Sequence, residues 1–355
     1  MTSELSFLES LLDAAGPSGF EVRPARVWRK EAEGFASDVR VDVSGNSYAT
    51  VNPEGSPRVM LAGHIDEIGL QITHIDEDGF LFVAEIGGWD AQVLVGQRVT
   101  ILTKADSVTG VVGKKGIHLI EPDERTKASK TKSLWVDVGA ESRDEVVELG
   151  IRVADPMVLA QPMVRLAGDR IASRAIDDRI GAYAVLEAIR LLAEDPAAAS
   201  ATAVATVQEE IGYSGGGART SAYALEPDVA IVVDVTFSTD VPDIEKRELG
   251  EHELGGGPVL SRGSAAQGEV FELLASVAEE EGIPYTVQAS PKATRTDADG
   301  IHLTRHGVPT GLVSIPNRYM HSPNEVVSLA DVHNTARLLA AFIRRLEPGT
   351  DFTPR

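Results

Sequence analysis

The chain has 355 residues, of which 43% are hydrophobic and 25% are charged, a composition typical of a soluble globular protein. Its net charge of −21 repels nucleic acid and anionic lipid, so neither is expected as a partner, and the absence of cysteine excludes disulfides, thiolate nucleophiles and cysteine-bound zinc. No apolar run approaches the roughly 18 residues of a membrane span, and the first residues lack the basic and apolar regions of a secretory signal. We therefore expect a cytoplasmic protein in which His, Asp and Glu are the available metal ligands.

The first 68 residues carry two helical and two extended patterns. Leucines at positions 5, 8, 11 and 12, followed by Gly16, predict an amphipathic helix that ends there. A second helix is expected over about residues 24–33. Residues 47–51 and 58–62 are short extended runs, and the stretch VMLA within the second predicts a buried parallel strand.

Between about residues 70 and 166 the pattern changes to short strands. The runs GLQITHI, FLFVAEI, RVTIL and SLWVDVGA are rich in β-branched and aromatic residues and are separated by Gly, Asp and Lys turns. Only residues 142–149 have a helical pattern. Short strands at this spacing predict a small β-barrel or sandwich.

After residue 170 helices and strands alternate again. Strands are expected at 202–208, 229–235 and 310–315, and helices at 178–194, 265–281 and 329–346. The last helix is expected to be capped by Ser328, with Asp331 three residues on. This alternation predicts an α/β fold, with a mostly parallel, doubly wound sheet formed by residues 1–68 and 168–355 and a small β-barrel domain inserted at 69–167.

Several segments place acidic or histidine side chains where a doubly wound sheet carries its site, just past the ends of strands. They are GHIDEIG with His64 and Asp66, SRAIDDRIG with Asp177 and Asp178, VQEEIG with Glu209 and Glu210, IVVDV with Asp234, and RYMHSPNE with His321. Residues two apart in an extended segment face the same side, so Asp66 is placed to orient His64 and raise its basicity.

Each segment also has a plainer interpretation. A lone Asp at position 177 or 178 caps a helix more often than it binds a metal. Asp234 fits a solvated strand end, His321 fits a loop histidine, and Glu209 with Glu210 fits two solvent-facing charges. The combination favours a site, because apolar strands deliver carboxylates repeatedly to the same sheet edge and two histidines are available to join them.

The number of these groups matches a dinuclear metal centre. Two metal ions about 3.5–4 Å apart need a shared carboxylate and two further ligands each, with positions left open for water and substrate. One bridging Asp, two terminal carboxylates and two histidines meet that need. The reaction also needs a base that is not a ligand, and the adjacent pair Glu209 and Glu210 has the form of one ligand and one base. Zinc is the first expectation for the two ions, with cobalt or manganese as alternatives.

The motifs GHIDEIG, AIDDRIG, VQEEIG, VVDV and RYMHSPNEVV occur here in the same order as in the tetrahedral aminopeptidases, metallopeptidase family forty-two, which they resemble. That family includes glutamyl and deblocking aminopeptidases and relatives labelled endoglucanases. The resemblance covers nearly the whole chain. It implies a di-zinc exopeptidase fold, an inserted barrel-like domain that builds oligomer contacts, and a hollow homododecamer built from dimers.

The resemblance also implies a set of metal ligands. Asp177 would bridge the two ions. His64 and Asp234 would complete one metal site, and Glu210 and His321 would complete the other.

The same resemblance implies the remaining roles and the activity. Glu209 would be the general base and Asp66 the orienting partner of His64. The expected reaction is removal of N-terminal residues from short peptides with a free N-terminus, with a metal-bridged hydroxide as nucleophile and Glu209 moving its proton to the leaving amine.

The sequence departs from the family pattern at two positions. Ser214 stands where the family commonly has Arg after the glutamate pair, and Arg295 replaces a glycine in the stretch ATRTDA. Neither position is a ligand. Both lie in segments expected to line the substrate or oligomer surface, so they bear on specificity and assembly rather than on the chemistry.

Other functions were weighed against this one. A related deacylase or carboxypeptidase could use the same metal centre, and would not depend on a free substrate amine. A glycan hydrolase would need a cleft rich in aromatics, which 5% aromatic content with no Trp near the motifs disfavours. A catalytically silent shell protein is disfavoured because Glu209 and every expected ligand are present.

Overall fold

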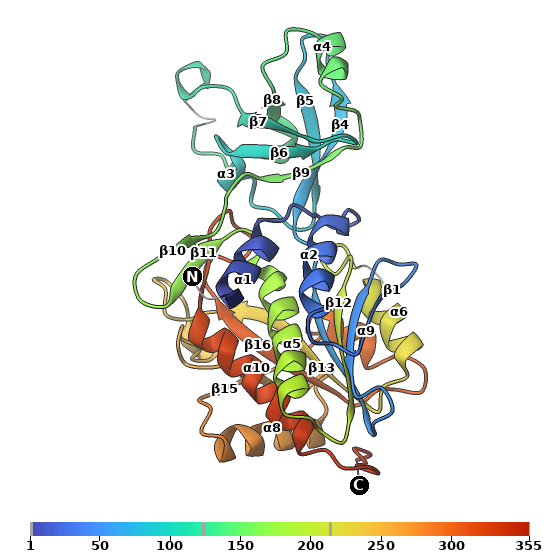
Figure 1. Ribbon diagram of the computed structural model, residues 1–355. Helices are drawn as coiled ribbons and strands as arrows, with labels where there is room; N and C mark the ends of the chain where they lie inside the picture. Colours follow the sequence, from blue (N-terminus) through green and yellow to red (C-terminus); the bar gives the residue numbers. More distant parts are fainter. Residues whose placement is uncertain (1–2, 123–124, 213–214, 355) are drawn as a thin grey trace.

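The computed structural model describes residues 3–122, 125–212 and 215–354, and within them it contains an eight-stranded sheet, a three-stranded sheet and a closed barrel. Figure 1 shows the barrel at one end of the molecule, beyond the helices that cover the large sheet. In order across the large sheet the strands are β1 (Asp38–Val41), β2 (Ser47–Val51), β12 (Ser200–Thr206), β3 (Arg58–His64), β13 (Val229–Phe237), β16 (Thr310–Asn317), β14 (Val259–Arg262) and β15 (Thr286–Ala289).

The four central strands of this sheet, β12, β3, β13 and β16, are parallel to one another. They are buried along almost their whole length, which explains why their sequences are continuous apolar runs rather than alternating ones. The sheet is not parallel throughout, because β2 and β14 each run antiparallel to their inner neighbours.

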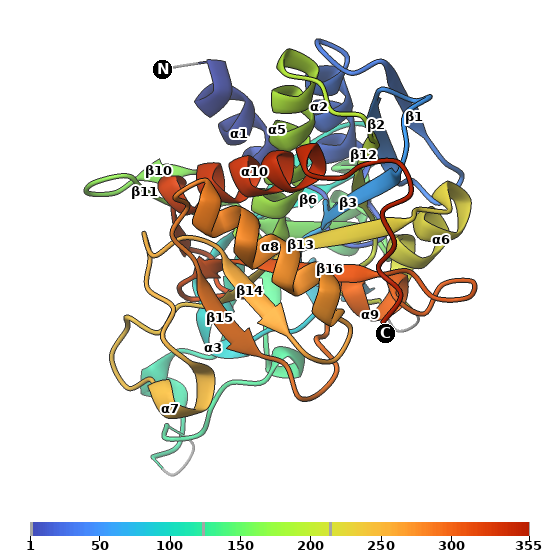
Figure 2. The same ribbon diagram turned by 90° about the horizontal axis from the view of Figure 1, so that it is seen from below.

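Helices cover both faces of the large sheet, as Figure 2 shows. One face packs against α1 (Ser3–Asp13), α2 (Val22–Ala32), α5 (Ile176–Glu194), α8 (Gly268–Glu280) and α10 (Leu329–Arg344). The other face packs against α6 (Gly216–Leu225) and α9 (Asp297–Ile301), and the short α7 (Lys246–Leu249) lies between β13 and β14 in the chain. None of the helices in the described residues could cross a membrane.

The barrel has its own apolar core. Its strands, in order around the barrel, are β4 (Gly69–Ile75), β5 (Leu81–Ile86), β8 (Trp135–Asp137), β7 (Ser107–Gly113), β6 (Arg98–Leu102) and β9 (Pro156–Leu159). The helices α3 (Ala91–Leu94) and α4 (Arg143–Glu148) and two single 3₁₀ turns, Ile117–Leu119 and Thr131–Ser133, connect them. The predicted fold class, an α/β protein with a small barrel, is confirmed. The sequence analysis did not anticipate α3, which is only one turn long.

A small three-stranded sheet joins the segment before α5 to the segment before α10. It consists of β10 (Val164–Arg165), β11 (Arg170–Ser173) and β17 (Glu325–Ser328), with β11 antiparallel to both neighbours. Because β11 leads into α5 and β17 follows the loop of residues 318–324, this sheet holds two distant segments side by side.

The predicted capping of the last helix is wrong. Ser328 does precede α10, but its hydroxyl donates to Asp169 Oδ2 at 2.6 Å instead of capping the helix. The same Asp169 oxygen accepts from the amide of Ala330. Asp169, which directly precedes β11, therefore caps α10. Asp331 is buried and accepts from the backbone amides of Gly255 and Gly257. Tertiary partners therefore replace the local capping box.

Gly63 allows α5 to lie directly on β3. A Cβ added at Gly63 would lie 2.6 Å from backbone atoms of Gly181 and Ala182, closer than atoms can approach. Trp28 Nε1 donates to the carbonyl of Ala182 at 2.8 Å and holds the same turn of α5 from the other side. The contact places the start of α5 beside the end of β3.

We predict that Gly63→Ala destabilises the fold by about 1–3 kcal/mol, the usual cost of overpacking a core, because backbone rather than a flexible side chain opposes the new methyl group. Urea denaturation of both proteins measures the loss. Gly268→Ala is the matched control, since a Cβ there meets no atom within 4 Å. Equal midpoints for Gly63→Ala and the parent would contradict the prediction.

Candidate metal centre

Histidine and carboxylate side chains converge at the carboxyl ends of the central strands. His64 is the last residue of β3, and Asp234 lies near the end of β13. Glu209 and Glu210 follow β12, which ends at Thr206 beside His64 in the sheet register. These strands are parallel, so their ends meet at one edge of the sheet.

Two further groups reach this edge from other elements. Asp177 lies at the start of α5, where residues 177 and 178 have non-helical backbone angles and the peptide bond between them is cis. His321 lies in the loop after β16. The structure thus brings together all seven residues to which the resemblance gives a role, Asp66 included.

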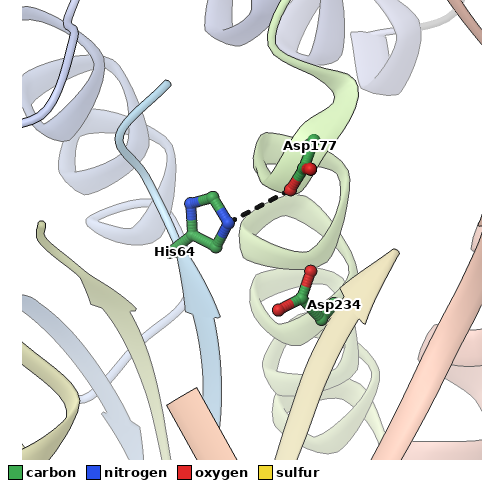
Figure 3. Close-up of side chains that lie close together, drawn as sticks. All are labelled: His64, Asp177 and Asp234. Carbon is green, nitrogen blue, oxygen red and sulfur yellow. Dashed lines mark hydrogen bonds and ion pairs between the residues drawn. The ribbon is translucent and has the colours of Figure 1, made fainter. Parts of the chain in front are cut away.

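The side chains form two triads that share Asp177. Asp177 Oδ1 lies 3.2 Å from His64 Nε2, and Asp177 Oδ2 lies 3.2 Å from His321 Nε2. His321 Nε2 is also 3.3 Å from Glu210 Oε2. One ligand atom from each of His64, Asp177 and Asp234 lies within 4.8 Å of the others, and the same holds for Asp177, Glu210 and His321. Figure 3 shows the first triad facing a common space.

Burial makes this concentration of carboxylates unfavourable without cations. Burial first, and then repulsion from Asp177, raises the pKa of both Asp234 and Glu210. Burial opposes protonation of His321, but its hydrogen bonds to Asp177 and Glu210 outweigh that effect and raise its pKa to about 11. Within the described residues no Lys or Arg forms an ion pair with Asp177, Glu210 or Asp234. The ion pairs come from histidines instead: His64 and His321 pair with Asp177, and His321 also pairs with Glu210.

The donor set fits two divalent ions. Nitrogen and carboxylate oxygen donors arranged in two triads around one shared carboxylate suit zinc and similar metals. Glu210 Oε1 is buried without a hydrogen-bond partner in the described chain. A buried carboxylate oxygen left without a donor is costly, and a cation at this position would satisfy it.

Asp66 supports the centre from behind. It is completely buried, and its Oδ1 lies 3.4 Å from His64 Nδ1, an ion-pair contact rather than a well-aligned hydrogen bond. Oδ1 also accepts from the amide of Glu209 at 3.2 Å, and Oδ2 accepts from the amide of Glu210 at 3.1 Å and from Ser18 Oγ. One carboxylate therefore positions a histidine and the backbone of both glutamates.

Glu209 and Glu210 point to different parts of the centre. Glu210 belongs to a triad, whereas Glu209 belongs to neither, and its Oε2 lies 3.8 Å from His64 Nε2. Burial raises the pKa of Glu209 to about 10. His64 opposes this shift, and among the acidic neighbours Asp234 adds most to it.

Asp177 and Asp178, of which the resemblance makes only Asp177 a ligand, have different positions. Asp178 is fully buried beneath the centre, and its Oδ2 accepts from the amide of His64 at 3.1 Å while Oδ1 accepts from the amide of Gly181. It belongs to neither triad. Its contacts fix the backbone of a ligand and the first turn of α5.

The sequence analysis missed Glu325. This residue begins β17 and is buried, and its Oε2 accepts from the amide of Asp177 at 2.9 Å while its Oε1 accepts from the amide of His321 at 2.7 Å. It thus ties together the two residues that the second triad takes from separate segments. The available signal was a lone acid at the start of the apolar run EVVS, four residues after His321.

The barrel contributes to the centre as well. The carbonyl of Gly88, two residues after β5, lies 2.8 Å from His321 Nδ1. A carbonyl can only accept, so this bond places the ring proton on Nδ1 and leaves Nε2 free to face Asp177 and Glu210.

A buried ionic network joins the centre to the N-terminal helix. Glu67 accepts from Arg174 Nη1 and, at 2.8 Å, from Arg179 Nη2. Arg179 has no exposed surface and also donates to the carbonyls of Leu11 and Leu12 at the end of α1. The guanidinium therefore satisfies carbonyls that the end of the helix leaves without partners.

A cleft of about 1200 Å³ opens in front of the centre. Glu209, Asp234 and the loop of residues 288–297 line it. Arg295, one of the two departures from the family pattern, lies in this wall with a φ of 60°, a left-handed conformation that explains why glycine is common there. Ser214, the other departure, lies outside the described residues.

Known proteins match this chain over most of its length. Residues 45–338 match the family model described as M42 glutamyl aminopeptidase. The lysyl aminopeptidase of Pyrococcus furiosus is 38% identical over 98% of both chains. The structure of a TET aminopeptidase from a marine sediment Thaumarchaeota archaeon has a TM-score of 0.92 and 35% identity, covering 97% of this chain and 96% of that one. PhTET1, solved as a dodecamer, has a TM-score of 0.85 and 30% identity, covering 98% and 100%.

We predict that Glu325→Gln weakens zinc binding about 10–100-fold, the usual effect of removing a partner that holds a ligand in place. A glutamine offers only one acceptor oxygen, so one of the two amides now bonded to Glu325 loses its acceptor. Competition with a chromophoric chelator measures the affinity. Glu347→Gln, an exposed change remote from the centre, is the control; identical zinc affinities in the two variants would show that Glu325 does not hold the ligands.

Proposed function

The chain belongs to the M42 glutamyl aminopeptidase family and is therefore a peptide hydrolase, and from this membership we propose that it removes N-terminal residues from short peptides with a free N-terminus, using two divalent metal ions. The observation that carries the proposal is the pair of donor triads sharing Asp177 at the head of the cleft. A shared carboxylate with two ligands on either side is what a dinuclear hydrolase needs.

In this proposal each metal has its own terminal ligands. His64 and Asp234 would hold one ion, Glu210 and His321 would hold the other, and Asp177 would be shared by both. We propose zinc as the native metal, with cobalt and manganese able to replace it. When bound, the two ions would polarise the scissile carbonyl and lower the pKa of a water molecule.

The proton transfers fall to Glu209. It lies at the centre but outside both triads, so its carboxylate remains free when the ligands are engaged. We assign it as the general base that accepts the proton of the attacking water and then delivers that proton to the leaving amine. Asp66 keeps it in place through the backbone amide, and cations in the triads would favour its ionised form.

The assembly is a second part of the proposal. We propose that residues 1–68 and 168–355 form the catalytic domain and that residues 69–167 form an oligomerisation domain that builds a dodecamer from dimers. PhTET1, with its TM-score of 0.85, supports this. The barrel also exposes large apolar side chains, namely Val95, Val111, Ile117, Leu119, Val147, Leu149 and Val153. Where such side chains gather into one patch, they mark a surface that another chain covers.

Replacing the two neighbouring glutamates separately tests the mechanism. Glu209→Gln removes only the proton acceptor, so we expect kcat to fall about 10²–10⁴-fold while the parent metal content is kept. Glu210→Gln replaces an anionic ligand by a neutral amide, so we expect one ion to bind weakly and activity to return partly with excess zinc. Metal analysis and kinetics with an aminoacyl chromophore measure both. Loss of metal from Glu209→Gln alone would show that the two roles are reversed, and parental behaviour of both variants would refute the site.

Light scattering tests the assembly. We expect a particle of twelve times the 37.8 kDa chain mass at micromolar concentration. Leu119→Glu, which places a charge on the exposed apolar side chain of the barrel's 3₁₀ turn, should shift the population to smaller species. Val43→Glu, at a fully exposed position away from the barrel, is the control. A monomeric parent would overturn the proposal.

A further inference from the structure

The cleft contains more acidic groups than the metal centre uses. The acids that line it are Asp177, Glu209, Glu210, Asp234, Asp297 and Asp299. Asp177, Glu210 and Asp234 belong to the triads, and Glu209 is assigned to proton transfer. Two carboxylates remain.

Asp299 is occupied by its own loop. Its Oδ1 accepts from the amide and the hydroxyl of Thr294, and its Oδ2 accepts from the amide of Arg295 at 2.8 Å. These bonds shape the wall of the cleft and use both oxygens. Asp299 therefore stabilises its own loop and leaves neither oxygen free for a substrate.

Asp297 is different, because one of its oxygens has no partner. The residue is 3% exposed, and Thr206 Oγ1 donates to its Oδ2 at 2.5 Å. Within the described residues no donor reaches Oδ1 and no Lys, Arg or His forms an ion pair with this carboxylate. The other buried acids beside the centre without a ligand role have partners on both oxygens: Glu67 has two arginines, and Asp66, Asp178 and Glu325 each accept from two backbone amides.

The position of Asp297 is close to the reacting groups. Thr206, which holds its carboxylate, is paired with His64 in the sheet, and neighbouring strands lie about 4.8 Å apart. Helix α9, which begins at Asp297, packs against β3 and β13, the strands that carry His64 and Asp234. In a peptide the α-amine is separated from the scissile carbonyl by a single carbon, so its binding group must lie this near to the metals.

A buried carboxylate with a free oxygen facing a cleft is suited to a cation that enters from solvent. We propose that Asp297 pairs with the α-ammonium group of the bound peptide and gives the enzyme its requirement for a free N-terminus. The inference rests on the proposed aminopeptidase function. In it Thr206 is the positioning residue, since its hydroxyl holds Oδ2 and leaves Oδ1 directed to the substrate.

Two hydroxamates that differ only in the amine test this inference. Leucine hydroxamate carries the α-amine, and 4-methylpentanehydroxamate lacks it, while both keep the same metal-binding group and side chain. Calorimetry on the zinc-loaded proteins measures the affinity of each. We expect the parent to prefer leucine hydroxamate, and Asp297→Asn to reduce that preference about 10- to 150-fold, the range for a hydrogen bond to a charged group. The affinity for the des-amino compound should stay unchanged.

Further variants and controls separate the interpretations. Asp299→Asn alters the same wall and should change both affinities alike. Thr206→Val leaves the charge of Asp297 but frees its carboxylate, so it should lower the preference in the same direction, and it provides the test if Asp297→Asn does not fold or does not retain zinc. An equal loss for both hydroxamates, or an unchanged preference, overturns the role of Asp297. A parent that has no preference for the amine and does not hydrolyse aminoacyl substrates instead overturns the proposed function.

Discussion

Mutual repulsion among buried carboxylates is the constraint around which the centre is organised. Asp177 lies within a few ångströms of both Asp234 and Glu210, and no Lys or Arg of the described chain forms an ion pair with any of the three. Such an arrangement is stable only when cations or protons offset the charge. Around it, Asp66, Asp178 and Glu325 are held by backbone amides, which supply positive dipoles without adding a competing cation. The protein fixes these side chains with neutral donors, an arrangement that fits a centre in which bound cations supply the compensating charge.

Much of this arrangement follows from local sequence. Apolar runs that end in His64 or Asp234 predict strands that carry ligands, because buried parallel strands are apolar throughout and their ends meet at one edge. Glu325 could not be assigned in this way. Its role depends on amides of Asp177 and His321, and the first lies 148 residues away. The predicted cap of α10 was wrong for the same reason, since Asp169 reaches Ser328 from the turn before β11 and replaces the local pattern.

The network beneath the centre couples its geometry to the packing of the N-terminal helix. Arg179 follows directly on Asp177 and Asp178, yet its guanidinium bonds the end of α1 and the carboxylate of Glu67. Removing α1 would take away two of the three carbonyls that accept from Arg179 Nη1, a loss for a fully buried cation that adds to the lost packing of the helix. The sequence shows an arginine beside two aspartates, which is the pattern of a surface ion pair. Only the fold shows that the three side chains diverge.

The hydrogen bond that His321 Nδ1 donates to the carbonyl of Gly88 ties the barrel to the candidate metal centre. The barrel otherwise has its own core and also meets the rest of the chain at a small apolar cluster of Ala15, Leu102 and Val158. Because of this hydrogen bond, a contact that immobilises the barrel also restrains the ring of His321. A metal ion bound by His321 would restrain the barrel in the same way. By thermodynamic linkage the two effects are equal: whatever factor barrel immobilisation adds to metal affinity, bound metal adds to immobilisation. Metal supply would then act as an allosteric effector of the barrel, even though no ion touches it.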